Sequence, residues 1–216
     1  MAGISFAMLG ALVCLGLCGC QSMYYGAMER LGFQKREILV DKVEEARDSQ
    51  EEAKEEFRSA LERFRTVTDF EGGELEEKYD KLSAAYESSK ARAADVRNRI
   101  DAVKDVADAL FAEWEDELDE YSRSSLRRSS EEKLRNTRRR YAELVRAMER
   151  AAARMNPVLE AFQDQVLYLK HNLNARAIAS LNTEVAAIQS DVDQLIREME
   201  ASIQEANRFI ASMTAE

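Results

Sequence analysis

Residues 75–121 read LEEKYDKLSAAYESSKARAADVRNRIDAVKDVADALFAEWEDELDEY, and the apolar pattern of this stretch decides the fold. A heptad register runs through it, with polar exceptions at Ser89 and Glu117. Apolar residues recur at alternating intervals of four and three at Leu75, Tyr79, Leu82, Tyr86, Ala93, Val96, Ile100, Val103, Ala107, Leu110, Trp114 and Tyr121. A stripe kept for about 47 residues is typical of a coiled-coil helix, which would extend about 70 Å at 1.5 Å per residue.

The same register continues on both sides of this stretch. An earlier helix carries the stripe Leu39, Val43, Ala46, Gln50, Ala53, Phe57, Ala60, Phe64 and Val67. Glu71-Gly72-Gly73 then breaks the pattern, as a turn does. Later stripes run through residues 134–169 and 178–213. One narrow stripe per helix has to be covered, so we expect the helices to pair with one another.

The boundaries of the later helices follow from local signals. Ser129 and Glu132 have the spacing of a capping box, which predicts a helix start at Ser129. Asn156-Pro157 predicts a kink. No glycine separates the last two stripes, so residues 129–213 form either a hairpin or one bent helix. The expected fold class is all-α: an elongated antiparallel coiled-coil-like helical bundle of four helices, or of three long ones.

The N-terminal segment has a different character from the rest of the chain. Residues 1–19 carry no charge and are mostly apolar, a length that suits a secretory signal better than a membrane span. Leu17-Cys18-Gly19-Cys20 looks like a lipobox, which predicts cleavage before Cys20 and acylation of that cysteine. The alternatives are an uncleaved signal anchor and an ordinary cleaved signal that leaves a soluble protein. The expected organisation is a lipoprotein signal peptide at 1–19, a lipidated membrane-proximal tether at 20–36 and a helical bundle at 37–216.

This assignment accounts for every cysteine. Cys14 and Cys18 would leave with the signal and Cys20 would carry lipid such as palmitate, so the mature bundle would have no disulfide and no free thiol. Gln21 replaces the aspartate that retains lipoproteins at the inner membrane. The expected location is therefore the outer membrane of the cell envelope, facing the periplasm.

Charge is distributed unevenly over an acidic chain of net charge −10, which argues against a nucleic-acid partner. Residues 105–120 contain eight acids and no base, whereas residues 122–154 contain 11 bases and 4 acids. Residues 41–80 are also acidic, with 15 acids and 7 bases, so we expect the basic third helix to lie beside both the first and the second helix, in ion pairs that mainly fix register. In an alternative interpretation, Arg123, Arg127 and Arg128 lie near the bilayer and contact anionic headgroups. Tyr24, Tyr25, Met28, Leu31 and Phe33 would then form an interfacial collar beside the anchor.

Catalytic and metal chemistry find little support. His171 is the single histidine, which is too few for a di-iron helical bundle, and it is expected to be an ordinary turn or cap residue. No phosphate-binding or dinucleotide glycine motif occurs. Gln50, Ser89 and Ser202 fall at core positions and are expected to set helix register. The tyrosines and Trp114 of the central stripe are expected in the core. The alternative is that they line a groove for an apolar ligand or a partner helix. We expect no cofactor, no metal and no enzymatic activity.

Two segments resemble a known family. Residues 35–54, KREILVDKVEEARDSQEEAK, and residues 164–178, DQVLYLKHNLNARAI, are similar to a bacterial envelope family catalogued as domain of unknown function 2959. The resemblance covers nearly all of the mature chain. It implies an all-helical envelope protein whose relatives are mostly proteobacterial and often carry a lipobox. It transfers no catalytic residues.

The expected function is that of a non-enzymatic, lipid-anchored periplasmic scaffold or adaptor that acts through helix-mediated interactions. Its expected partners are the membrane, through the anchor, proteins that the sequence does not identify, and a second copy of the chain in a homo-oligomer. The alternative is a carrier or sensor that holds a lipid or apolar ligand between helices.

Overall fold

The computed structural model describes residues 35–68, 75–172 and 175–215. Within these residues the chain forms four α-helices and one short 3₁₀-helix: α2 (Lys35–Thr68), α3 (Leu75–Glu117), η1 (Leu118–Glu120), α4 (Ser124–His171) and α5 (Ala175–Thr214). The all-α prediction is confirmed. The predicted signal peptide, Cys20, the aromatic collar and the Glu71-Gly72-Gly73 turn lie outside the described residues.

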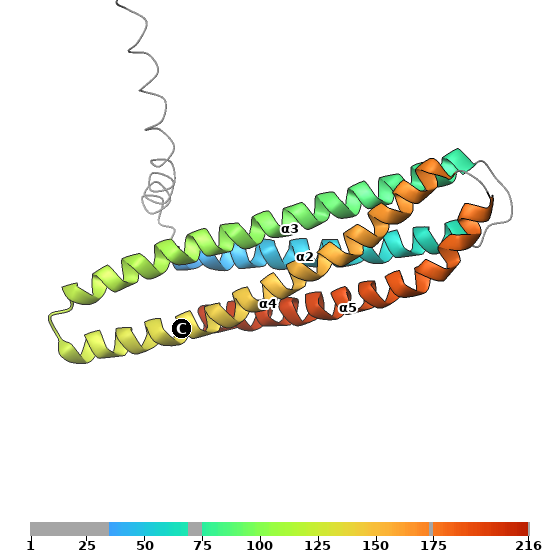
Figure 1. The fold of residues 1–216 in the computed structure, drawn as a ribbon. Helices are drawn as coiled ribbons and strands as arrows, with labels where there is room; N and C mark the ends of the chain where they lie inside the picture. The colour runs from blue at the N-terminus through green and yellow to red at the C-terminus, as the bar shows by residue number, and fades with distance from the viewer. Residues whose placement is uncertain (1–34, 69–74, 173–174, 216) are drawn as a thin grey trace, which may run out of the picture.

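The helices form one elongated antiparallel bundle (Figure 1). Each helix runs opposite to the one before it, and the neighbouring pairs are α2 with α3, α3 with α4, α4 with α5, and α5 with α2. Helix α4 ends at His171 and α5 runs back from Ala175. Residues 129–213 therefore belong to a helical hairpin, and the four-helix alternative holds over the three-helix one.

The predicted heptad stripes form the core. Every predicted stripe residue of α2 from Leu39 to Phe64 is buried, including the polar Gln50. In α3 the stripe is buried from Leu82 to Leu110 except at Tyr86, which packs half-buried against the core as Leu75, Tyr79 and Trp114 do. All four helices contribute to a single hydrophobic cluster, so the narrow stripes are satisfied within one chain.

Helix α4 starts earlier than its capping-box signature predicts. It begins at Ser124, after Arg123 in extended conformation, and no side chain caps it. Ser129 and Ser130 lie inside the helix, so the predicted start at Ser129 is wrong. The hydroxyl of Ser130 instead accepts a hydrogen bond of 2.8 Å from Nε1 of Trp114 on α3, which helps to hold this first part of α4 against α3. The helix also continues through Pro157 as a single element.

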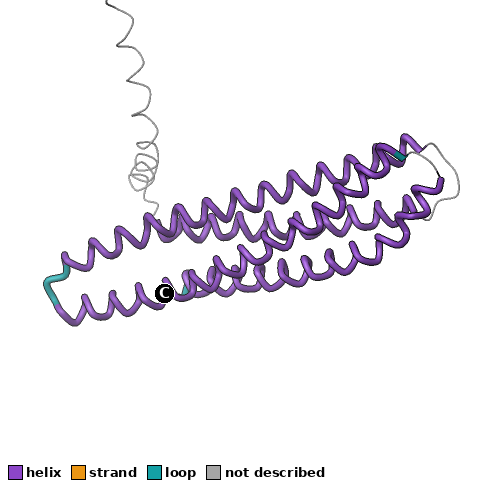
Figure 2. The backbone as a smooth tube through the Cα atoms, in the orientation of Figure 1, coloured by secondary structure: helices purple, strands orange, loops and turns teal. Residues whose placement is uncertain are grey.

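The α3–α4 hairpin extends beyond the other two helices (Figures 1 and 2). Nζ of Lys35, the first residue of α2, lies 2.7 Å from Oε1 of Glu113 on α3. Beside it, Nη2 of Arg36 donates to the carbonyl oxygen of Met213, near the end of α5. Residues of α3 beyond Glu113, and the facing first turns of α4, therefore have neither α2 nor α5 beside them.

Candidate functional site

The projecting part of the α3–α4 hairpin is held together by its own contacts. Besides the Trp114–Ser130 hydrogen bond, the guanidinium of Arg138 pairs with Glu115 and lies 5.2 Å from the ring centroid of Phe111. At the base of the projecting part, Phe111 of the bundle core meets Tyr141 edge to face, with centroids 5.3 Å apart. These contacts make the hairpin a two-helix extension of the bundle rather than a loose loop.

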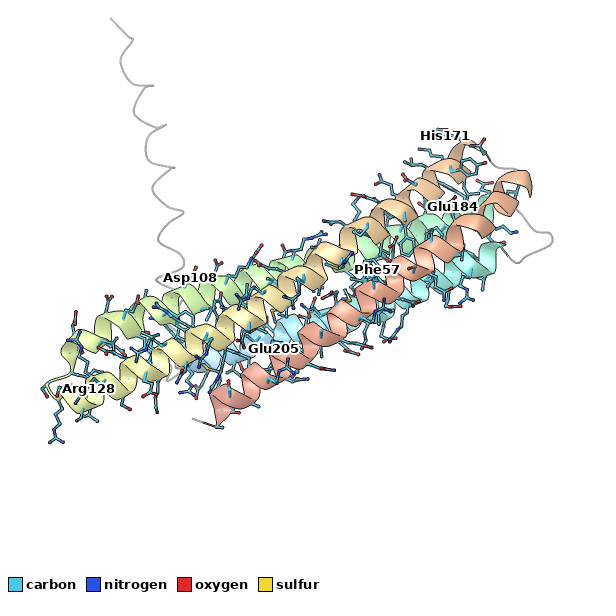
Figure 3. The ribbon with its side chains drawn as sticks, turned by 60° about the horizontal axis from the view of Figure 1, so that its bottom comes forward. Phe57, Asp108, Arg128, His171, Glu184 and Glu205 are labelled. Atoms are coloured by element: carbon cyan, nitrogen blue, oxygen red, sulfur yellow. The ribbon has the colours of Figure 1, made fainter. Side chains whose placement is uncertain are left out.

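The three predicted headgroup-contact arginines lie together at the end of this hairpin, which we call the hairpin tip (residues 118–128). Arg127 is engaged within the protein: its Nη2 lies 3.0 Å from Oδ1 of Asp119 and its Nε lies 3.1 Å from Oε1 of Glu131. Arg128 donates from Nε to the carbonyl of Ser124 and extends away from the tip (Figure 3). Among the described residues, neither Arg123 nor Arg128 forms an ion pair with a carboxylate.

Two large apolar side chains are exposed at the hairpin tip. Tyr121 is 41% exposed and Leu126 is 51% exposed. The prediction that Tyr121 belongs to the core is wrong, because α3 ends at Glu117 rather than at Tyr121. Tyr121 follows η1 in extended conformation, beyond the ends of α2 and α5. Leu126 carried no periodic signal in the sequence.

A second exposed apolar pair lies at the opposite end of α4. Leu167 is 45% exposed and Tyr168 is 42% exposed, and we call these two residues the distal patch. They lie between the buried Val166 and Leu169, so the four consecutive apolar residues 166–169 cannot all face the core. That run was the available sequence signal, and the sequence reasoning missed it. His171 is the exposed last residue of α4, and Figure 3 shows it at the end opposite Arg128.

A surface cleft of about 240 Å³ lies between α3 and α4. Its floor includes Ile100, and its walls carry charged and amide groups that are paired with one another. Arg97 donates to Oδ1 of Asn156 at 2.6 Å, and Nζ of Lys104 lies 2.5 Å from Oε1 of Glu149. The hydrogen bond to Glu149 raises the pKa of Lys104. The cleft therefore combines an apolar floor with walls whose charged and amide groups are mostly paired.

The prediction that the basic helix lies beside both acidic helices holds for α3 and is wrong for α2, because α4 packs beside α3 and α5 and is diagonal to α2. The basic helix α4 lies beside the acidic end of α3, with Arg127 and Arg138 reaching Asp119 and Glu115. Glutamates of α2 also form ion pairs at the surface of the bundle. Glu45 contacts both Lys42 and Arg99, and the hydrogen bond from Lys42 is the main reason that the pKa of Glu45 is lowered.

The predicted polar core positions are buried without partners. The side chains of Gln50, Ser89 and Ser202 have no exposed area and make no hydrogen bond within the described part of the chain. Thr137, which the sequence reasoning did not single out, behaves in the same way. Each residue lies on a different helix, so every helix carries one such group.

Within residues 35–68, 75–172 and 175–215, no group of three or more histidine, cysteine, aspartate or glutamate side chains is placed to hold a metal ion. Across the same residues, no helix combines the length and the apolar character that crossing a bilayer requires.

These features define an elongated, ion-paired four-helix bundle with exposed apolar side chains at its two ends. The chain matches the sequence model of a family described as "Protein of unknown function (DUF2959)" over residues 24–213. It belongs to that family, as the two quoted segments predicted. Neither a curated protein nor a solved structure shows a significant match to the chain.

Proposed function

We propose that this chain is a non-enzymatic, lipid-anchored adaptor of the bacterial cell envelope that holds a protein partner at a set distance from the membrane. The observation that carries the proposal is the position of exposed apolar side chains. In the described part of the chain, the large exposed ones are Tyr121 and Leu126 at one end of α4, and Leu167 and Tyr168 at the other.

The bundle has the shape of a spacer. Leu126 and Leu167 are 41 positions apart on one continuous helix, so they are separated by about 60 Å at 1.5 Å per residue. Between them the surface carries interhelical ion pairs such as Lys104–Glu149 and Arg58–Glu200, and such exposed pairs favour a solvated face over a docking surface. Contact with partners is therefore expected at the ends.

The anchor gives the spacer its direction. The lipobox at Leu17 to Cys20 precedes the family match, which begins at residue 24, so the predicted signal peptide lies outside the matched domain. Acylation of Cys20 would attach the chain to the membrane fifteen residues before α2 begins at Lys35. The distal patch lies at the far end of α4 from Lys35 and suits a protein partner held away from that membrane.

Anchoring is tested by feeding cells that produce the chain with a labelled fatty acid. The wild-type protein should carry the label and the Cys20→Ser variant should not. Absence of label from the wild type would contradict the anchor.

Partner binding is tested by placing a photoreactive amino acid at position 168 in living cells. The matched control is position 146, an exposed arginine in the middle of the same helix. We expect a discrete adduct from position 168 alone. Once the adduct is identified by mass spectrometry, the purified partner should bind the wild-type chain and fail to bind Leu167→Glu. Equal adducts from both positions would contradict the adaptor role.

Native mass spectrometry separates the adaptor from the carrier. Stoichiometric lipid that stays bound to the purified chain after removal of detergent, and is not attached to Cys20, would favour the carrier. The charged walls of the α3–α4 cleft lead us to expect none.

A further inference from the structure

We infer that the hairpin tip rests on the lipid surface to which the chain is anchored, inserting Leu126 and Tyr121 among the headgroups while Arg123 and Arg128 face lipid phosphates. The inference rests on the proposed lipid anchor at Cys20 and deepens it, because it assigns a second membrane contact formed by the folded bundle itself.

The hairpin tip lies on the side of the bundle from which the anchor arrives. Lys35, where the chain enters the bundle, is paired with Glu113, and the hairpin continues past this point to Tyr121. Eight residues of helical rise correspond to about 12 Å, so the tip is the leading edge on the side from which the anchor arrives. The tether from Cys20 to Lys35 can span up to about 50 Å when extended, so the tip can reach the bilayer surface.

The side chains at the tip have the chemistry of a membrane interface. Tyrosine and leucine beside arginine are favoured there, where apolar groups enter the headgroup region and cations meet phosphates. Tyr121 and Leu126 are both more than two-fifths exposed, so both are available to enter that region.

The tip carries a small excess of positive charge. It contains the acids Asp119 and Glu120 and the bases Arg123, Arg127 and Arg128, so its net charge is three minus two, or +1. Arg127 is occupied by Asp119 and Glu131, whereas Arg123 and Arg128 are exposed and form no ion pair with a carboxylate of the described residues. Further back along α3, Glu113 and Glu115 are paired with Lys35 and Arg138, and the exposed Asp116 and Glu117 lie behind the tip.

The anchor would raise the effective concentration of the tip at the membrane. A chain already held by its acyl groups brings the tip repeatedly to the surface, so the contact becomes intramolecular and needs little affinity of its own. A tip with only two exposed apolar side chains and two exposed arginines without a carboxylate partner is then sufficient.

The experiment uses the intrinsic fluorescence of a single tryptophan. Trp114 is the only tryptophan of the chain, so a Trp114→Phe background has no tryptophan emission, and Leu126→Trp places one indole at the tip. Because Trp114→Phe also removes the hydrogen bond to Ser130, circular dichroism first verifies that the background keeps the helix content of the wild type. The matched control is Tyr168→Trp in the same background, at a position of similar exposure on the opposite end of α4. The lipidated full chain is reconstituted in vesicles of phosphatidylethanolamine and phosphatidylglycerol that contain a lipid spin-labelled near the headgroup.

We expect the chain to float with the vesicles, and the indole at position 126 to shift to the blue and be quenched. The indole at position 168 should keep the emission it has in water. Adding Arg123→Gln and Arg128→Gln should reduce the quenching at position 126, whereas Arg139→Gln and Arg146→Gln, on exposed positions further along α4, should not.

Flotation without quenching at position 126 would overturn the tip contact and leave the anchor intact. Equal quenching at positions 126 and 168 would also overturn it, because the bundle would then lie flat. Failure of the chain to float would contradict the anchor and, with it, this inference.

Discussion

The rings of Phe64 on α2 and Phe162 on α4 stack across the centre of the bundle, with centroids 4.5 Å apart and planes 8° from parallel. Helices α2 and α4 are diagonal to each other rather than neighbours in the ring of helices. This contact therefore joins the α2–α3 pair to the α4–α5 pair through the core. Phe57 lies near the same Phe162 ring, at 6.4 Å.

Truncating Phe162 is expected to be among the most destabilising single changes. Phe162→Ala should lower the free energy of unfolding by about 3–5 kcal/mol, because it removes a fully buried ring and leaves a cavity between two hairpins. Urea unfolding followed by circular dichroism measures the change. Leu167→Ala, on the same helix but exposed, is the control and should stay within about 0.5 kcal/mol of the wild type. Similar losses for both variants would contradict the packing described.

Replacing the buried amide of Gln50 should stabilise the chain. Gln50→Leu keeps a similar volume and removes two buried polar atoms without partners, so the free energy of unfolding should rise by about 1–3 kcal/mol. Gln163→Leu, an exposed position on α4, should have little effect. A drop in stability for Gln50→Leu would mean that the amide has a partner after all. Size-exclusion chromatography of the same variant shows whether Gln50 also fixes the assembly state.

The Trp114–Ser130 hydrogen bond should show measurable coupling. Trp114→Phe and Ser130→Ala each break it, and the double variant should lose less than the sum of the two by about 1 kcal/mol. Additive losses would show that the bond contributes nothing to holding the hairpin end together.

The raised pKa of Tyr141 leads us to expect that the free energy of unfolding falls at alkaline pH. Burial, followed by the nearby negative charges of Asp108, Glu149 and Asp105, raises the pKa of Tyr141 to about 12. The folded state therefore keeps a proton that the unfolded chain releases near pH 10. The corresponding stability is fully present below pH 10 and is lost as the pH rises to about 12, by about 1–2 kcal/mol after allowance for solvent screening.

The measurement is urea unfolding at several pH values in that window, compared with Tyr141→Phe. The variant should lose less stability than the wild type over the same interval, because the other tyrosines are common to both proteins. Parallel curves for the two proteins would show that Tyr141 titrates normally.

Much of the bundle could be predicted from the sequence because burial in a long helix follows the heptad directly. The stripe from Leu39 to Phe64 was predicted residue by residue, and every member is buried. The start of α4 could not be predicted in this way. The capping-box spacing at Ser129 is a local signal, and it was overridden by long-range contacts of the hairpin, such as the hydrogen bond from Trp114 to Ser130.

The candidate site was predicted only in part. The sequence placed Arg123, Arg127 and Arg128 together at the second turn, but it contained no information on which acids face them across that turn. The exposure of Tyr121 was missed for a related reason. A heptad stripe shows which face of a helix is apolar. Whether that face is buried depends on where the partner helices end.

The unequal helix lengths also have a dynamic consequence. Past Glu113, the α3–α4 hairpin consists of two helices without the four-helix core. Its backbone amides are therefore expected to exchange with deuterium faster than the amides of the turns that carry Phe57 and Phe162, which lie in that core. Opening of this end requires no opening of the rest. The tip can therefore loosen, or change its orientation, while the remaining sixty ångströms or so of the rod stay folded.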